Sequence, residues 1–171
     1  MKLITFVTMI GTATLFCQVP INVPKLSAHP GVDLKIPLTT GDLSGQNVTS
    51  FEFVVSCDTS VLKLTGVEQE GTLSTGLTMF ANNRVRPFNP GRMKVVCASA
   101  QPLSGSGVLV YLTAKTQKAI GVTQIQLSNF VLNTGTPATQ ITNGVFTASV
   151  PENAKKATSR DTVPLTRNHP E

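Results

Sequence analysis

The sequence of 171 residues contains no tryptophan and a single tyrosine, Tyr111. Sugar-binding platforms rely on the broad aromatic faces of these two residues, so the shortage argues against tight binding to crystalline polysaccharide. Charged residues make up 13% of the chain, where about a quarter is usual. No motif or interleaving of basic and aromatic residues suggests a nucleic-acid partner, and we expect none.

Histidine is almost as scarce. His29 lies in a Pro-Gly turn and His169 near the C-terminus, and neither has the spacing of a metal site. No nucleophile motif accompanies His29, which argues against a catalytic triad. Glu52 interrupts an apolar run, but no second carboxylate is tied to it as a glycosidase pair requires. We therefore expect no enzyme activity, no metal and no cofactor.

Three cysteines are present, at positions 17, 57 and 97. Alternation places Cys57 and Cys97 on the inward faces of their strands, where cysteine behaves as a small apolar residue. A disulfide would be usual in an exported protein. If the two strands pair antiparallel, however, the two cysteines lie several residues apart along the ladder, which is too far for a bridge. We predict that both are free thiols.

The composition indicates one domain between two terminal segments. Residues 1–18 place Lys2 before an uncharged, largely apolar run, as a secretory signal peptide does, and no membrane span is expected once it is removed. Residues 151–171 have only two large apolar side chains and are predicted to be a disordered tail. The domain is therefore expected to span residues 19–150 of a secreted protein, extracellular or at the cell surface.

Within the domain, short apolar or alternating runs separated by glycine, proline, asparagine and serine indicate β-strands. No segment has a convincing helical period. This pattern predicts an all-β fold, an antiparallel sandwich or barrel of nine strands with little or no helix. The expected strands are residues 19–23, 32–38, two from 48–67 parted at Asp58, 77–82, 92–99, 107–116, 122–133 and 141–150.

The segment Cys57-Asp58-Thr59-Ser60 interrupts two of these runs. Short oxygen-bearing side chains hydrogen-bond nearby backbone amides, so we expect a tight turn here.

The charge of the domain is mildly positive, with nine basic and six acidic residues between positions 19 and 150. Four of the basic residues, Arg84, Arg86, Arg92 and Lys94, fall within eleven positions. They form either a solvated basic strand pair or a surface for an acidic protein partner.

Several segments, in this order, resemble bacterial cohesin domains. They are "GDLSGQNVTSFEFVVSCDTSVLKLTGV" (41–67), "GTLS" (71–74), "PGRMKVVCASAQPLSGSGVLVYLTAKT" (90–116), "IQLSNFVLN" (125–133) and "TNGVFT" (142–147). The resemblance covers about residues 19–150. It implies a nine-stranded jelly-roll sandwich, similar in fold to certain cellulose-binding modules, that binds the calcium-loaded dockerin domain of an enzyme and has no catalytic activity itself.

The resemblance also implies a binding face built by the third, fifth, sixth and eighth strands. Alternation assigns eight outward candidates for partner binding: Glu52, Val54, Ser56, Thr78, Phe80, Arg92, Lys94 and Val96. Phe80 has two interpretations, as an exposed anchor with a charged rim or as a core residue, because a slip of one residue reverses a strand.

Three functions remain open for the domain. The first is capture of a dockerin-like or similar secreted protein in polysaccharide degradation or surface assembly. The second is a carbohydrate-binding module of the same fold, with weak polysaccharide contact through Tyr111 or through Asn82, Asn83 and Arg84. The third is a structural subunit of a surface assembly. A single domain without an accompanying scaffold departs from the habit of cellulosomal cohesins.

Overall fold

The computed structural model describes residues 18–83 and 91–150. Nearly all of the predicted signal peptide and the whole predicted tail lie outside these residues, as do Arg84 and Arg86. Among the described residues, none belongs to a helix, and no candidate membrane-spanning helix is found there.

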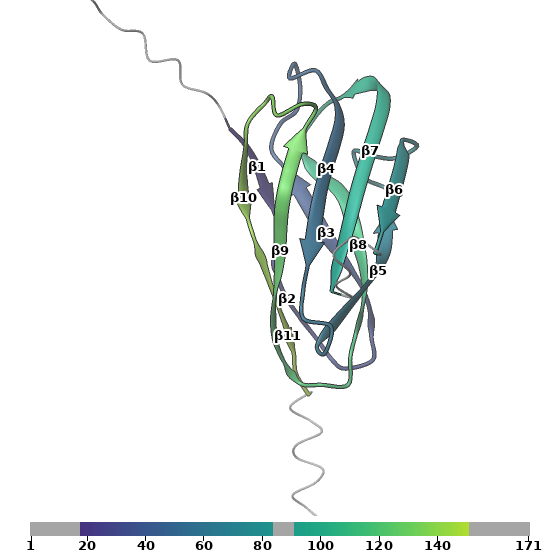
Figure 1. Ribbon diagram of the computed structural model, residues 1–171, viewed down its shortest axis with the longest axis vertical. Coiled ribbons are helices and arrows are strands. Elements are labelled where there is room, and N and C mark those ends of the chain that lie inside the picture. The colour runs from purple at the N-terminus through teal and green to yellow at the C-terminus, as the bar shows by residue number, and fades with distance from the viewer. Residues whose placement is uncertain (1–17, 84–90, 151–171) are drawn as a thin grey trace, which may run out of the picture.

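Two β-sheets pack face to face in a jelly-roll sandwich, which confirms the predicted all-β class (Figure 1). The described strands are β1 (Val19–Asn22), β2 (Lys25–Ala28), β3 (Asp33–Thr40), β4 (Val48–Ser56), β5 (Leu62–Glu68), β6 (Thr78–Asn82), β7 (Arg92–Leu103), β8 (Gly107–Thr116), β9 (Gly121–Leu132), β10 (Thr139–Thr142) and β11 (Gly144–Ala148). One sheet has the order β10-β1-β3-β8-β5 and the other the order β2-β11-β9-β4-β7-β6.

The strand count exceeds the nine predicted because the first and last strands are each divided between the sheets. β1 and β10 belong to the five-stranded sheet, while β2 and β11 belong to the six-stranded sheet. No strand was predicted between residues 23 and 32, whereas β2 occupies residues 25–28 there. The sandwich is also not wholly antiparallel, because β1 pairs with β10, and β2 with β11, in parallel.

The two divided strands cross between the sheets side by side. Pro24 lacks an N–H group and lies between β1 and β2, so the ladder is interrupted there. A Cβ atom on Gly144 would lie 2.5 Å from Cγ1 of Val23 and 2.7 Å from the carbonyl oxygen of Pro24. Only glycine permits this approach, and Asn143 supports the crossing by accepting a hydrogen bond from the Leu127 amide at 2.9 Å.

The core fills the space between the sheets. Phe51, Phe53 and Phe130 form a stack in which Phe53 and Phe130 are 5.4 Å apart between ring centroids. Phe51, Phe53 and Val55 are at most 1% exposed, as their alternation along residues 48–56 predicts.

The turn predicted at Asp58 carries the chain from the six-stranded to the five-stranded sheet. The Asp58 carboxylate accepts hydrogen bonds from the amide and the hydroxyl of Ser60, both at 2.8 Å. These bonds, the one from the amide foremost, lower the pKa of Asp58. The Asp58 carbonyl accepts a further bond from the Leu62 amide at 2.9 Å, and β5 begins at this residue.

Both described cysteines are free thiols, as predicted. β4 and β7 pair antiparallel so that Cys97 lies opposite Phe51, whereas Cys57 follows Ser56, which lies opposite Arg92. The two cysteines therefore lie several residues apart along the ladder. Burial raises the pKa of each thiol to about 11, which keeps both protonated and unreactive at neutral pH.

Candidate docking face

Four neighbouring strands, β9, β4, β7 and β6, form most of the outer surface of the six-stranded sheet (Figure 1). They correspond to the eighth, third, sixth and fifth predicted strands. We call the outward side of these four strands the docking face. All eight residues predicted as partner contacts lie on these strands, and the strand register places them on one side of the sheet.

The register arranges these side chains in rows across the sheet. In one row Phe80 lies opposite Val96, Val96 opposite Glu52, and Glu52 opposite Val131. A neighbouring row holds Asn82, Lys94, Val54 and Ser128. Ser56 and Arg92 lie opposite each other in the next row, while Thr78 lies opposite Ala98 beyond Phe80.

Phe80 occupies the outward register of β6. Its side chain is 70% exposed, while the preceding residue, Met79, packs against the core. The interpretation of Phe80 as a core residue is therefore wrong. Val96 beside it is 37% exposed, so the row presents two adjacent apolar side chains to solvent. Exposed aromatic residues are typical of protein interfaces, and Val96 extends the apolar surface around Phe80.

Val54 is the exception among the predicted contacts, because its side chain is only 5% exposed. It lies on the central strand of the face, between Lys94 on β7 and Ser128 on β9. Side chains on both neighbouring strands can cover a short branched residue in this position. Val54 therefore has little surface to offer a partner, although its predicted direction is right.

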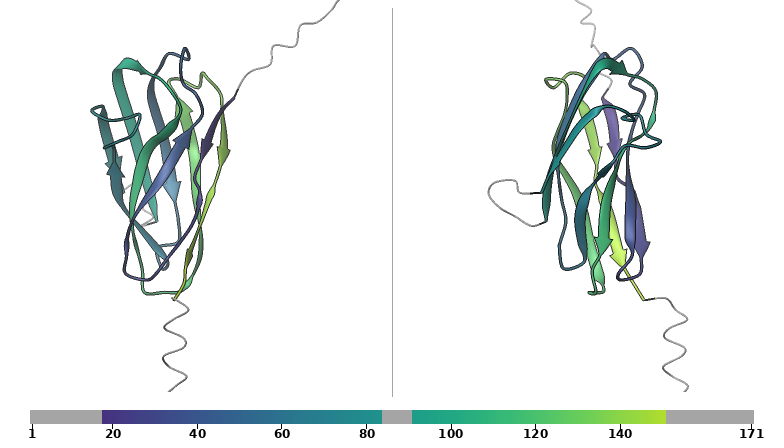
Figure 2. Two further views of the ribbon diagram at one scale, coloured as in Figure 1. Left: turned by 180° about the vertical axis from the view of Figure 1, so that it is seen from behind. Right: turned by 90° about the vertical axis from the view of Figure 1, so that its right-hand side faces the viewer.

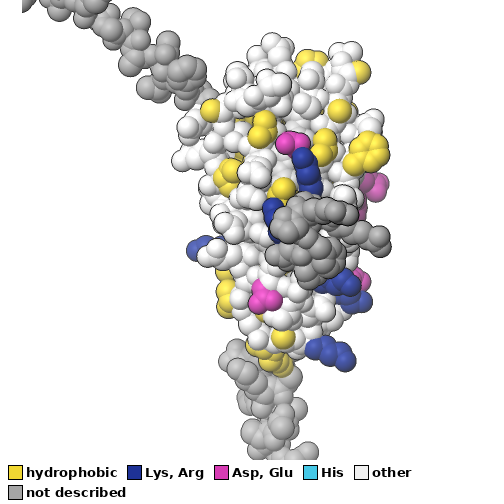
Figure 3. All heavy atoms as spheres, in the orientation of Figure 1, with side chains coloured by type: hydrophobic (Ala, Val, Ile, Leu, Met, Phe, Trp, Pro, Cys, Tyr) yellow, Lys and Arg dark blue, Asp and Glu magenta, His cyan; other side chains and the backbone are white. Residues whose placement is uncertain are grey.

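Two charged side chains of the docking face form an ion pair. Nζ of Lys94 lies 3.0 Å from a carboxylate oxygen of Glu52, and both side chains are 42% exposed. Figure 3 shows this face, with basic and acidic groups near the middle and scattered apolar side chains around them. An exposed ion pair contributes at most about 1 kcal/mol to folding, so its value lies in the charge pattern that it presents.

A shallow pocket of about 330 Å³ lies at one end of the face, between the end of β4 and β9. It is lined by Ser56, Cys57, Asp58, Thr123, Gln124 and Gln126. The amide of Asp58 donates a hydrogen bond to the hydroxyl of Thr123 at 2.8 Å, which ties the turn to β9. With hydroxyl and amide groups at its rim, the pocket suits a polar side chain.

The predicted contacts omit β9, which contributes Gln124, Gln126, Ser128 and Val131 to the face. Residues 122–127 alternate exposed and buried, and the polar and apolar residues at 124–127 made this alternation visible in the sequence. The second half of β9 was harder to assign. Asn129 has a φ of 51°, and the register between β4 and β9 shifts between Glu52 and Val54. Such a bulge moves the later residues of the strand relative to a simple alternation.

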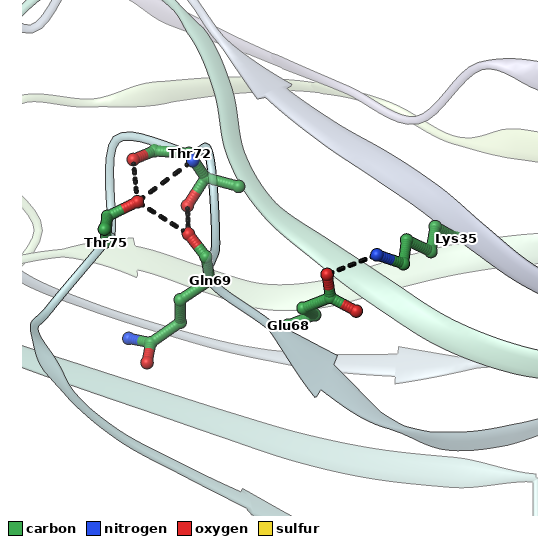
Figure 4. A network of polar contacts seen from close by, with 5 residues as sticks. All are labelled: Lys35, Glu68, Gln69, Thr72 and Thr75. Atoms are coloured by element: carbon green, nitrogen blue, oxygen red, sulfur yellow. Dashed lines mark hydrogen bonds and ion pairs between the residues drawn. The ribbon is translucent and has the colours of Figure 1, made fainter.

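The outer surface of the other sheet has a different character. Lys35 on β3 forms an ion pair with Glu68 at the end of β5, and Glu68 raises the pKa of Lys35 (Figure 4). In the turn that follows, the carbonyl of Gln69 accepts hydrogen bonds from the hydroxyls of Thr72 and Thr75 at 2.7 and 2.8 Å. The contacts among Gln69, Thr72 and Thr75 therefore stabilise the connection between β5 and β6.

Among residues 18–83 and 91–150, no group of three or more histidine, cysteine or acidic residues is placed to hold a metal ion. The carboxylates of Asp42 and Asp58 each cap a turn through Ser44 and Ser60. The side chain of Ser44 foremost lowers the pKa of Asp42. Both carboxylates therefore stabilise turns of the chain.

An open sheet face with an exposed aromatic residue and a surrounding charge pattern is typical of a β-sandwich binding module. The comparisons with known proteins identify its family. The model of the cohesin domain matches residues 19–151, and the chain belongs to this family. None of the curated proteins compared with the chain matches it.

Solved structures show the same fold. A non-cellulosomal cohesin from the archaeon Archaeoglobus fulgidus is 20% identical, with a TM-score of 0.63 over 82% of this chain and 98% of that one. The sixth cohesin of scaffoldin B from Acetivibrio cellulolyticus, in complex with a Cel5 dockerin, is 19% identical, with a TM-score of 0.65 over 78% and 100%. A type I cohesin–dockerin complex from Clostridium thermocellum, Coh-OlpA–Doc918, is 15% identical, with the same score and coverage.

Proposed function

We propose that the chain is a secreted, non-catalytic module that captures a dockerin-bearing or similar extracellular protein through its docking face. The observation that carries this proposal is the row Phe80, Val96 and Glu52, which combines exposed apolar surface with a charged rim on an open sheet. Membership of the cohesin family and the dockerin complexes of similar structures support the choice of partner.

The face itself supports a partner with an acidic contact surface. Arg92 and Lys94 stand beside one another on β7, with Glu52 as the acidic residue among the predicted contacts. An opposing surface rich in carboxylates would gain favourable electrostatic contacts with β7, while apolar groups at its centre would cover Phe80 and Val96. This arrangement requires no chemistry from the chain beyond recognition.

Calcium should be required by the partner and not by this chain. We expect isothermal titration with purified, calcium-loaded dockerins to show binding that is abolished by chelator and restored by calcium. The thermal midpoint of the chain alone should be the same with and without chelator, because the described residues form no metal cluster. Binding that persists in chelator, or failure of every dockerin tested to bind, would contradict this part of the proposal.

Polysaccharide binding is the second candidate, and one observation favours it. Tyr111 lies on the outer side of the five-stranded sheet, between Pro37 and Glu68. One row away is a pocket of about 320 Å³ lined by Asp33, Leu34, Lys35, Thr65, Thr113 and Ala114. A half-buried tyrosine next to a polar pocket could stack on a single sugar ring.

A cellulose pull-down separates the two functions. If the docking face is the functional site, we expect no retention of the chain on insoluble cellulose and no effect of Tyr111→Ala on partner titration. Retention that is lost in Tyr111→Ala, together with no binding to dockerins, would favour the carbohydrate-binding function. Tyr111 and Phe80 lie on opposite outer faces of the sandwich, so each substitution leaves the other surface intact.

A further inference from the structure

The strand β6 ends the six-stranded sheet. It pairs antiparallel with β7, from Thr78 opposite Ala98 to Asn82 opposite Lys94, and it is the last described strand in the order of this sheet (Figures 1 and 2). The free edge of such a strand can extend the ladder with another strand. Proteins usually prevent this with charges, prolines, bulges or very short edge strands.

Two of the other three edge strands carry a charged residue, whereas β6 carries none. β5 contains Lys63 and a register shift between Leu64 and Gly66. β2 begins with Lys25, and both β2 and β10 are four residues long. The sequence of β6, Thr-Met-Phe-Ala-Asn, has no charged residue and no proline, and its pairing with β7 is regular over five residues.

The sequence of β6 also suits pairing with itself. Phe80 is the middle residue of the five, so antiparallel pairing of two copies about this position sets Phe80 opposite Phe80. The same register sets Met79 opposite Ala81. Cross-strand aromatic pairs stabilise antiparallel sheets, and the absence of charge on β6 removes the repulsion that would oppose self-pairing. The contact would set the two copies of Phe80, the most exposed large apolar side chain among the described residues, side by side on the docking face.

We propose that two copies of the chain associate through antiparallel pairing of their β6 strands about Phe80, which joins their six-stranded sheets into one. The symmetry axis of such a pair is perpendicular to the sheet, so both docking faces point the same way. The dimer is a bivalent form of the module, suited to a partner that carries two recognition elements. This association does not depend on the identity of the docking partner.

The interface is small, because only five residues of each copy pair directly. Specific interfaces that bury less than about 1,200 Å² in total are typical of weak or transient complexes. We therefore expect a dimer that forms reversibly and is detected only at high protein concentration.

Sedimentation velocity over a wide range of concentrations tests the proposal on the full chain. Wild type should shift from monomer to dimer as concentration rises. Ala81→Lys places a charge on the exposed edge of β6 and should weaken association by about tenfold or more. Gln140→Lys adds the same charge to the edge strand β10 of the other sheet and should associate like wild type. A monomer at every concentration, or association unchanged in Ala81→Lys, would overturn the proposal.

Cross-linking provides a second test that does not depend on the strength of association. Directly opposed residues of an antiparallel pair have Cα atoms about 4.5–5.5 Å apart, within the range of a disulfide. Phe80→Cys should therefore form a disulfide-linked dimer under mild oxidation, in a background with Cys17→Ser. Lys63→Cys in the same background, on the protected edge strand β5, should not. Equal cross-linking of the two variants would count against β6 pairing.

The two proposals can fail separately. Successive side chains of a strand point to opposite sides, so Ala81, next to Phe80, points away from the docking face. Ala81→Lys should therefore leave the affinity for a docking partner unchanged while it disrupts the dimer. A chain that dimerises but binds no dockerin would retain the dimer proposal and contradict the proposed function.

Discussion

Replacement of Phe53 by alanine should lower the free energy of unfolding by about 3–5 kcal/mol. Phe53 is 0% exposed and lies within 6.2 Å of Phe51 and 5.4 Å of Phe130 between ring centroids. The substitution removes one of the three packed rings and leaves a cavity between the two sheets. Because domains of this size are usually stable by about 5–15 kcal/mol, the loss is a large part of the total. Urea or guanidinium denaturation measures it.

Phe80→Ala is the matched control for this measurement, since it removes the same side chain from an exposed position on the same sheet. We expect a change within about 1 kcal/mol, because little of the ring leaves water on folding. A small effect of Phe53→Ala, or equal effects of the two substitutions, would show that the stacked phenylalanines do not form the core as described.

Local signals were sufficient to predict much of the fold. Alternation from Phe51 to Val55 placed Phe51, Phe53 and Val55 inside, because the side-chain period of a strand is two. The Asp58 turn was predictable from its own side chains, which hydrogen-bond the amides two residues ahead. The free thiols followed from a geometric property of antiparallel pairing, and Cys97 opposite Phe51 confirms it.

The remaining features depend on residues that are distant in sequence. The division of the first strand after Asn22 depends on where β10 and β11 lie, and the close approach of Gly144 to Val23 is invisible from either segment alone. The burial of Val54 results from neighbours on β7 and β9. Alternation predicted that Val54 points outward, but the packing of the neighbouring strands decides how much of its side chain is exposed.

Reversal of both basic charges on β7 should weaken binding to the docking partner by a factor on the order of one hundred, since like charges across an interface cost several kcal/mol. Arg92 and Lys94 are two residues apart on one strand and point to the same side. In the variant Arg92→Glu/Lys94→Glu, Glu52 loses its ion pair and lies beside the new carboxylate at position 94. Because these side chains are partly exposed, the fold should persist, which denaturation can check.

The double reversal Lys63→Glu/Lys115→Glu provides a control of equal total charge. These two lysines lie opposite each other on β5 and β8, on the outer side of the five-stranded sheet. Both variants alter long-range electrostatic steering through the same change in net charge, so a difference between them in titration reports local contacts. We expect the control to retain most of its affinity, and a loss of the same size in both variants would remove β7 from the binding site.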